Sequence, residues 1–100
     1  MRVVLSDQAN AGLREIALFI ARDNRTRARS FVRELRAKAR EIGDMPRAFP
    51  LVPRYEHQGI RRRTYRDYLI FYRIEDDRLV IIYILHGAMD YEALLFPDAP

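Results

Sequence analysis

The sequence contains no cysteine and no tryptophan, and only one of its eighteen basic residues is a lysine. Without cysteine there is no disulfide framework and no thiolate nucleophile, which suits a reducing compartment. The two histidines, His57 and His86, do not by themselves make a metal site. The four glycines are too scattered for a glycine-rich phosphate loop. We therefore expect neither a metal nor a cofactor.

Length and composition predict one globular domain over residues 1–100. The chain is 49% hydrophobic and 32% charged, a balance typical of proteins with a single modest core. The apolar run near the N-terminus, Val3–Leu5, is too short for a signal peptide, and no segment is long enough to cross a membrane. We therefore expect a cytoplasmic protein with no membrane partner.

The net charge of +4 depends almost entirely on arginine. Guanidinium groups bind phosphates and carboxylates through paired hydrogen bonds, so this bias favours a surface that binds an anionic partner. That partner is either nucleic acid or an acidic protein segment, because net charge does not choose between them. The alternative is an arginine-rich genome that uses arginine where others use lysine.

Two apolar runs, 68–74 and 79–86, flank the charged segment Glu75–Arg78. Both runs have the length of strands and are rich in β-branched and aromatic residues, which predicts a β-hairpin. A single buried helix is the alternative, but the acidic turn argues against it. Because both runs are almost continuously apolar, we expect them at the centre of a sheet with at least one covered face.

Two helices are predicted between the N-terminal strand Val3–Leu5 and Gly43. Ser6 is the expected N-cap of the first helix, over residues 7–22, whose apolar residues recur at steps of three and four. Asn24 is the expected N-cap of the second helix, and Gly43 is the expected C′ residue that ends it. The short link predicts an antiparallel pair whose apolar face packs on the sheet.

The second helix also has a row of arginines along one flank, which we call the arginine stripe. The acidic residues of this helix, Glu34 and Glu41, fall on the opposite flank. Like charges four residues apart destabilise a helix slightly, so the stripe indicates an acidic partner. The alternative is a solvated face with counter-charges from elsewhere in the fold. The stripe consists of Arg25, Arg29, Arg33, Arg36 and Arg40.

Residues 44–100 are expected to supply a connector, the third strand of the mainly antiparallel sheet and a C-terminal tail. Residues 44–58 contain three prolines, each after an apolar residue, and are expected to form an extended connector. Ile60–Tyr65 is a third strand, and its three consecutive arginines predict either a sheet edge or a strand that faces solvent on one side. Asp90–Leu95 begins a short tail, residues 90–100. The expected fold is therefore α+β, in the order β-α-α-β-β-β, with a helical hairpin on a mainly antiparallel, twisted sheet.

Two segments of the chain have characteristic sequences: residues 68–74 are YLIFYRI, and residues 84–90 are ILHGAMD. These segments and the order of elements resemble those of the RelE/ParE superfamily of bacterial toxins. Residues 68–74, YLIFYRI, are similar to the family's Y-[R/L]-I-F-Y-R-V strand. Residues 84–90, ILHGAMD, are similar to its V-L-H-G-A-R-D strand end, with Met89 where the family usually has arginine. Asn24 and residues 31–35 match the first half, so the resemblance covers nearly the whole chain. The C-terminal HGA-D element is more similar to that of the ParE branch than to that of the RelE branch.

The resemblance implies the toxin of a type II toxin–antitoxin pair, a system of growth inhibition and plasmid stabilisation. Its partners would be a ParD-like antitoxin, in a toxin–antitoxin hetero-oligomer, and DNA gyrase, which ParE-like toxins are associated with poisoning. The antitoxin would lay an extended or helical segment over the toxin's groove and sheet edge. Operator binding then belongs to the antitoxin, so no direct sequence-specific DNA binding by this chain is expected.

Two other functions remain open at this point. RelE-like relatives cut messenger RNA in the ribosome, and a detoxified relative would bind an antitoxin and inhibit nothing. A ribonuclease needs an acid or base, together with cations that stabilise the charged phosphorane. The residues that could serve are His86, Arg61, Arg63, Arg73 and Tyr91. The alternatives are structural: His86 bonds a neighbouring carbonyl or carboxylate such as that of Asp90, and Arg73 pairs with Glu75 or Asp67.

A gyrase inhibitor would act by binding, with no covalent chemistry of its own. We expect its contact residues around one end of the sheet and in the tail, and we expect a second surface for target or antitoxin on the arginine stripe. The first set is Arg61, Arg66, Arg73, His86, Asp90, Tyr91, Leu94 and Leu95. The second set is Arg29, Arg33, Arg36 and Arg40.

Overall fold

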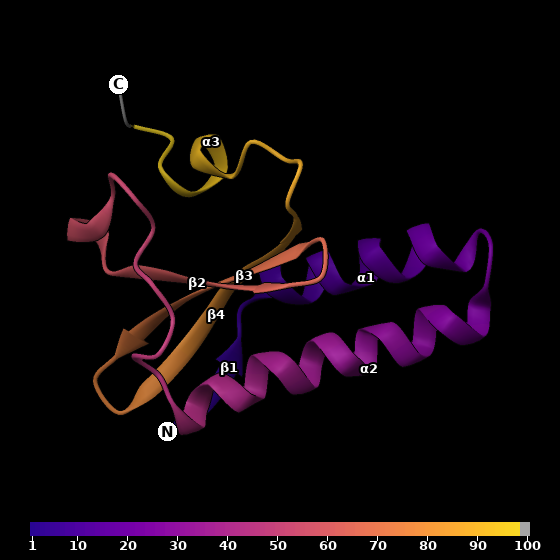
Figure 1. Ribbon diagram of the computed structural model, residues 1–100, viewed down its shortest axis with the longest axis horizontal. Helices are drawn as coiled ribbons and strands as arrows, with labels where there is room; N and C mark the ends of the chain where they lie inside the picture. The colour runs from indigo at the N-terminus through magenta and orange to yellow at the C-terminus, as the bar shows by residue number, and fades with distance from the viewer. Residues whose placement is uncertain (99–100) are drawn as a thin grey trace.

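The computed structural model describes residues 1–98 and shows two long helices on one face of a four-stranded sheet (Figure 1). The predicted α+β class and the predicted order of elements are confirmed. The helices and strands are β1 (Arg2–Leu5), α1 (Asp7–Ala21), α2 (Arg25–Glu41), β2 (Ile60–Tyr65), β3 (Tyr68–Glu75), β4 (Arg78–His86) and α3 (Tyr91–Leu95). Two 3₁₀ turns, Ile42–Asp44 and Glu56–Gln58, lie in the connector.

The predicted hairpin forms the two central strands of a sheet ordered β1-β4-β3-β2. The β2–β3 and β3–β4 pairs are antiparallel, whereas β1 runs parallel to β4. Asp76 in the hairpin turn has a φ of 48°, in the left-handed region that aspartate tolerates better than most residues. β2 is confirmed as an edge strand of this sheet, although Leu51 of the connector forms a bridge with Arg61 on its outer side.

The start of α1 is fixed to the sheet by its capping residue. The Ser6 hydroxyl accepts a hydrogen bond of 3.0 Å from the Ala9 amide, so the predicted N-cap is confirmed. The same hydroxyl donates to the carbonyl oxygen of Ile82 in β4 at 2.6 Å. Further along the helix, a Cβ on Gly12 would lie only 2.4 Å from the carbonyl oxygen of Ile84. The absence of a side chain at Gly12 therefore lets α1 lie directly against β4.

Helix α2 begins as predicted but does not end as predicted. The Asn24 side-chain oxygen accepts a hydrogen bond of 2.9 Å from the Arg27 amide. The expected role of Gly43 as a C′ residue is wrong, because the α-helix ends at Glu41 and Gly43 lies inside the following 3₁₀ turn without a positive φ. Close packing explains this glycine instead, since a Cβ there would lie 2.5 Å from the carbonyl oxygen of Met1.

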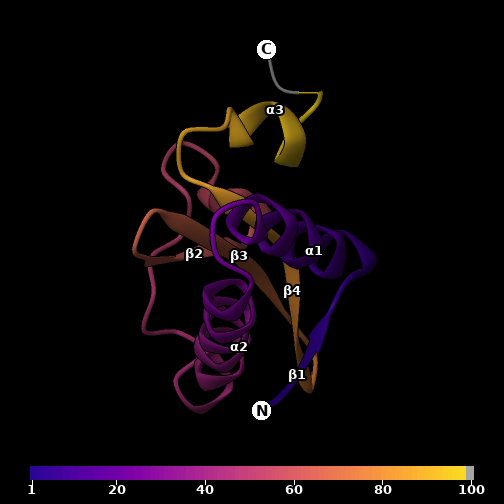
Figure 2. The same cartoon turned by 90° about the vertical axis from the view of Figure 1, so that its right-hand side faces the viewer.

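The central hairpin buries side chains on both of its faces, as its continuous apolar runs predict. On the helix face, Tyr72 is fully buried against α1 and α2, and its hydroxyl donates a hydrogen bond of 2.7 Å to the Pro46 carbonyl oxygen. On the opposite face, Phe71 forms a smaller cluster with Val52 of the connector and Phe96 after α3. In both views α3 and α2 lie on opposite sides of the molecule, with the sheet and α1 between them (Figures 1 and 2).

Candidate functional site

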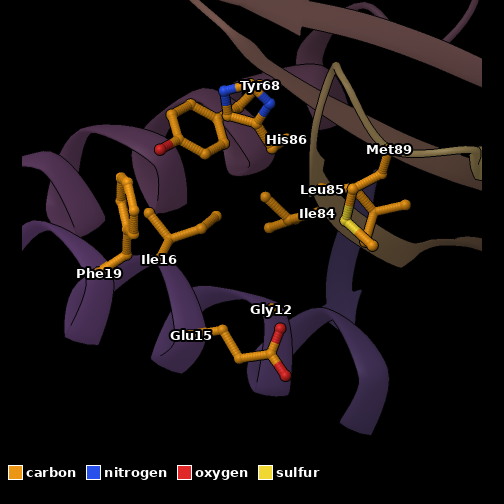
Figure 3. Close-up of a pocket in the computed structure, with 9 residues that line it drawn as sticks. All are labelled: Gly12, Glu15, Ile16, Phe19, Tyr68, Ile84, Leu85, His86 and Met89. Carbon is orange, nitrogen blue, oxygen red and sulfur yellow. The ribbon is translucent and has the colours of Figure 1, made fainter.

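A pocket of about 360 Å³ opens between α1 and the His86 end of the central hairpin. Figure 3 shows the side chains of Ile16 and Phe19, on α1, facing the rings of Tyr68 and His86. Phe19 is 64% exposed although it lines the pocket. The walls are mainly apolar, and Glu15 adds a carboxylate, so the pocket suits an apolar group of a partner. The lining residues are Gly12, Glu15, Ile16, Phe19, Tyr68, Ile84, Leu85, His86 and Met89.

His86 is an exposed residue at the last position of β4, beside this pocket. Its ring stands edge-on to the Tyr68 ring, with 5.3 Å between the ring centroids. Its Nδ1 accepts a hydrogen bond of 3.1 Å from the Ala88 amide, rather than bonding the expected carbonyl or carboxylate. Asp90 instead caps α3, because its carboxylate accepts a hydrogen bond from the Ala93 amide. In the neutral ring, an amide donor at Nδ1 corresponds to the tautomer that carries its proton on Nε2.

Arg73 lies toward the opposite end of the sheet from His86. Within the β3–β4 ladder, Tyr68 is opposite His86 whereas Arg73 is opposite Val80. Arg73 is five positions beyond Tyr68, which corresponds to roughly 17 Å along the strand. Arg73 Nη1 lies 3.8 Å from a carboxylate oxygen of Glu75, which is one of the two pairings expected for it. The expectation that Arg73 and His86 share one sheet end is therefore wrong, and a contact role for Arg73 stays a prediction.

The three consecutive arginines of β2 are held by hydrogen bonds within the fold. Arg61 and Arg63 extend toward the helix face, where they donate to the carbonyl oxygens of Phe49 and Lys38 at 2.7 and 2.9 Å. Arg62 extends to the other face and donates to the Tyr91 hydroxyl at 3.0 Å. Arg61 is opposite Tyr72 in β3, so it also lies away from His86. Arg61 and Arg63, two of the cations that could stabilise a phosphorane by clamping its phosphate, are thus engaged by carbonyl groups within the fold.

Arg66 is the basic residue that does lie at the His86 end of the sheet. It occupies the turn between β2 and β3 with a φ of 53°, and its side chain lies over the Tyr65 ring, with 5.6 Å between Cζ and the ring centroid. Arg66 and His86 line a second, smaller hollow together with Gly87 and Ala88. Of the four basic residues expected around one sheet end, the structure therefore brings together Arg66 and His86.

The tail packs on the sheet face opposite α1 and α2. The Tyr91 ring lies 5.0 Å from the Phe71 ring, measured between centroids. Leu95 is half-buried against the same cluster, whereas Leu94 is 42% exposed. Asp90, the N-cap of α3, is exposed. Of the tail's apolar candidates, Leu94 is therefore the one whose side chain a partner can reach without moving α3.

Sequence reasoning missed Phe96, which anchors the tail. This side chain is only 6% exposed, and its ring stacks on that of Tyr55 with 3.9 Å between centroids and 5° between the ring planes. The signal in the sequence is an aromatic residue immediately before Pro97, in a segment that is otherwise short of large buried groups. The sequence predicts no burial for Phe96 because Tyr55, whose ring covers it, lies far earlier in the chain, in the connector.

The arginine stripe occupies the outer flank of α2. Four of its members are exposed and Arg36 is half-buried. Within residues 1–98 none of the five arginines forms an ion pair, so the expected counter-charges from elsewhere in the fold are not present there. Glu34 instead accepts a hydrogen bond of 2.8 Å from the Tyr65 hydroxyl, and Glu41 lies 3.1 Å from Arg63.

Within residues 1–98, no group of three or more histidine, aspartate or glutamate side chains is placed to hold a metal ion. None of the helices in this part of the chain is long and apolar enough to cross a membrane. The sheet end presents the imidazole of His86, the guanidinium group of Arg66, the carboxylate of Asp67 and an apolar pocket that includes the carboxylate of Glu15. Together they suit binding of another macromolecule.

Comparison with known proteins identifies relatives of this fold. The family model for the ParE toxin of the type II toxin-antitoxin system parDE matches residues 3–91. Among solved structures, a chain from the chromosomal ParDE TA system of P. aeruginosa is similar, with a TM-score of 0.71 and 17% sequence identity. The alignment covers 86% of the present chain and 95% of that chain. A search of the curated proteins finds no match.

Proposed function

The chain belongs to the ParE toxin family of type II toxin–antitoxin systems, and we propose that it inhibits bacterial growth by binding DNA gyrase and blocking its cycle. The resemblance of residues 84–90 to the ParE branch supports gyrase as the target. One observation above all supports a binding mode without covalent chemistry: Arg73 in β3 and His86 in β4 lie toward opposite ends of the β3–β4 ladder. A ribonuclease would need its acid or base and its phosphate clamps at one site.

We place the target-binding surface at the His86 end of the sheet. Arg66 and His86 are both exposed there and line the same hollow. The apolar pocket beside His86 offers a place for an anchoring side chain of the target, as is usual at protein interfaces. The exposed Leu94 of α3 follows His86 closely in the chain and extends the candidate surface.

We assign neutralisation to a ParD-like antitoxin with an acidic, amphipathic segment that covers the groove between α1 and α2. Leu18 in this groove is 71% exposed, and exposed apolar side chains of this size mark interaction sites when they are grouped. Arginines at the rim complement an acidic segment and would also speed its association. The groove residues are Arg14, Ala17, Leu18, Ala21, Arg25, Ala28, Arg29 and Val32.

A supercoiling assay with purified gyrase and relaxed plasmid tests the target. The full chain is expected to stop supercoiling or to accumulate linearised plasmid. The double variant Arg66→Asn/His86→Gln is expected to need at least about tenfold more protein for the same effect, because two contact residues are lost. The control Arg2→Asn/His57→Gln makes the same chemical changes at exposed positions outside the site, and it should act like the wild type.

A chain that arrests growth while supercoiling continues unimpaired would overturn the gyrase proposal. Cleavage of ribosome-bound messenger RNA would then be measured, and its abolition by His86→Gln would establish the ribonuclease instead. For the antitoxin, Leu18→Glu is expected to prevent neutralisation by a co-expressed cognate ParD-like protein without reducing toxicity. Full neutralisation of this variant would show that the groove is not the antitoxin site.

A further inference from the structure

Helix α2 concentrates the positive charge of the protein. Between Arg25 and Glu41 there are seven basic and two acidic residues, whereas the whole chain has a net charge of +4. Both acids are on the flank away from the arginine stripe, where Glu34 accepts a hydrogen bond from Tyr65 and Glu41 pairs with Arg63. The charge of the stripe is therefore left uncompensated by its own helix, and the remainder of the chain is slightly acidic.

The stripe belongs to helix α2, which runs along one outer side of the molecule (Figure 1). Its members follow one another at intervals of three or four residues, which is about 4.5–6 Å along the helix axis, and the row is about 22 Å long. Its guanidinium groups belong to exposed or half-exposed residues. A partner with regularly repeated negative charges can engage several of them at once, and one strand of duplex DNA presents a phosphate about every 3.4 Å along the axis.

The part of the stripe outside the groove between α1 and α2, which consists of Arg33, Arg36 and Arg40, offers a partner very little apolar contact. The most exposed large apolar side chains, Leu18 and Phe19, belong to α1, and among residues 1–98 no exposed large apolar side chain lies on α2. Protein partners bind mainly through apolar, aromatic or arginine anchors that become buried at the interface. Phosphate-backbone binding, in contrast, depends on cations and needs no apolar anchor. The surface therefore fits nucleic acid better than an acidic protein segment.

We propose that the arginine stripe of α2 binds the phosphate backbone of duplex DNA without reading its sequence. Arginine suits this role because its planar guanidinium group forms paired hydrogen bonds with phosphate oxygens. The like charges along α2 disfavour the free helix slightly, and phosphate neutralisation removes that repulsion. The inference does not depend on gyrase as the target, since it concerns free duplex DNA. It is compatible with antitoxin binding, because Arg33, Arg36 and Arg40 lie outside the groove assigned to the antitoxin.

The test is fluorescence anisotropy of the purified full chain with a labelled duplex of about 20 base pairs and arbitrary sequence, titrated at several salt concentrations. Binding is expected to weaken linearly on logarithmic axes as salt rises, with a slope no steeper than about −4.5 for five phosphate contacts. The variant Arg33→Gln/Arg36→Gln/Arg40→Gln should flatten the slope by up to about 2.7 and weaken binding at low salt at least tenfold.

Two matched variants distinguish loss of the stripe from a change in net charge and from a general effect of substitution on folding. Arg2→Gln/Arg47→Gln/Arg78→Gln removes the same three charges elsewhere and should change affinity less than about threefold, if the stripe is the site. Arg33→Lys/Arg36→Lys/Arg40→Lys keeps the charges and should keep the slope. Equal losses in both glutamine variants would overturn the proposal, as would the absence of salt-dependent binding. A third outcome would also overturn it: no DNA binding, together with tight binding of a glutamate-rich peptide that is lost in Arg33→Gln/Arg36→Gln/Arg40→Gln. That result would assign the stripe to a protein partner.

Discussion

The Nη2 atom of Arg54 lies 2.6 and 2.8 Å from the two carboxylate oxygens of Glu92, and this ion pair joins the connector to α3. The Arg54 side chain is 74% exposed, and exposed ion pairs contribute little to stability because water and salt screen them. Phe96, which is almost fully buried against Tyr55, lies four residues beyond Glu92. We attribute the attachment of the tail chiefly to this aromatic contact.

Replacement of Phe96 should therefore loosen the tail more than replacement of Arg54. Phe96→Ala is expected to lower the free energy of unfolding by about 3 kcal/mol, because it removes a buried ring and leaves a cavity. Arg54→Ala should have a much smaller effect. Chemical denaturation of both variants makes the comparison, and an equal or larger loss for Arg54→Ala would show that the ion pair holds the tail.

Gly12→Ala tests the close approach of α1 to β4. A Cβ at this position would lie 2.4 Å from the Ile84 carbonyl oxygen, which belongs to the backbone of a central strand and has little freedom to move. The expected cost of overpacking, about 1–3 kcal/mol, exceeds the gain of up to about 1 kcal/mol in helix propensity. Thermal unfolding should show a lower Tm. An unchanged or raised Tm would mean that α1 can shift away from β4, so that the gain in helix propensity outweighs the cost of overpacking.

The contact between Tyr65 and Glu34 predicts a dependence of stability on acid pH. The Tyr65 hydroxyl and the Arg27 guanidinium lower the pKa of Glu34 below its ordinary value of 4.5. The ionised carboxylate therefore stabilises the folded state above pH 4.5, and this contribution disappears as the pH falls through the folded-state pKa. The difference in unfolding free energy between wild type and Tyr65→Phe should shrink over that range. Denaturation at a series of pH values measures it, and a constant difference would contradict the assignment.

Tyr72 predicts the opposite dependence at alkaline pH. Burial raises the pKa of its phenol above the ordinary value of 10.0. The neutral phenol thus stabilises the fold below pH 10, and this contribution is lost as the pH rises toward the folded-state pKa. Tyr72→Phe loses the hydrogen bond to Pro46, about 1 kcal/mol at neutral pH, but should be less sensitive to alkali. In an ultraviolet absorbance titration, the number of tyrosines that ionise only when the protein unfolds should be one lower in Tyr72→Phe than in the wild type.

The elements that the sequence predicts correctly are those specified by neighbouring residues. Ser6 and Asn24 cap helices through hydrogen bonds that reach three residues ahead. The central hairpin is specified by two apolar runs and the charged segment between them. These local signals were sufficient for the fold class and for the order of the elements. They also identified β2 as an edge strand, because three consecutive arginines do not fit the centre of a sheet.

The predictions that fail concern contacts between distant segments. Gly43 follows an apolar periodic run, as a residue that ends a helix does, but its close neighbour is the backbone of Met1, which is distant in the sequence. Arg73 and His86 are both near the ends of apolar runs, yet the antiparallel register places them toward opposite ends of the sheet. Phe96 is buried by Tyr55. No spacing rule in a single sequence supplies these pairings, since each depends on how two elements are docked.

Strand β1 is the first element of the chain, and its hydrogen-bonding partner is the last strand. Arg2 to Leu5 pair in parallel with Arg78 to Ile81, so the sheet cannot be completed until β4 has been synthesised. Pairings between such distant segments form late, because the loop between them must close before any contact is gained. On the ribosome, a nascent chain that stops before β4 therefore has no complete sheet and no His86 end. The sheet that carries the candidate binding surface therefore forms only after β4 has been made.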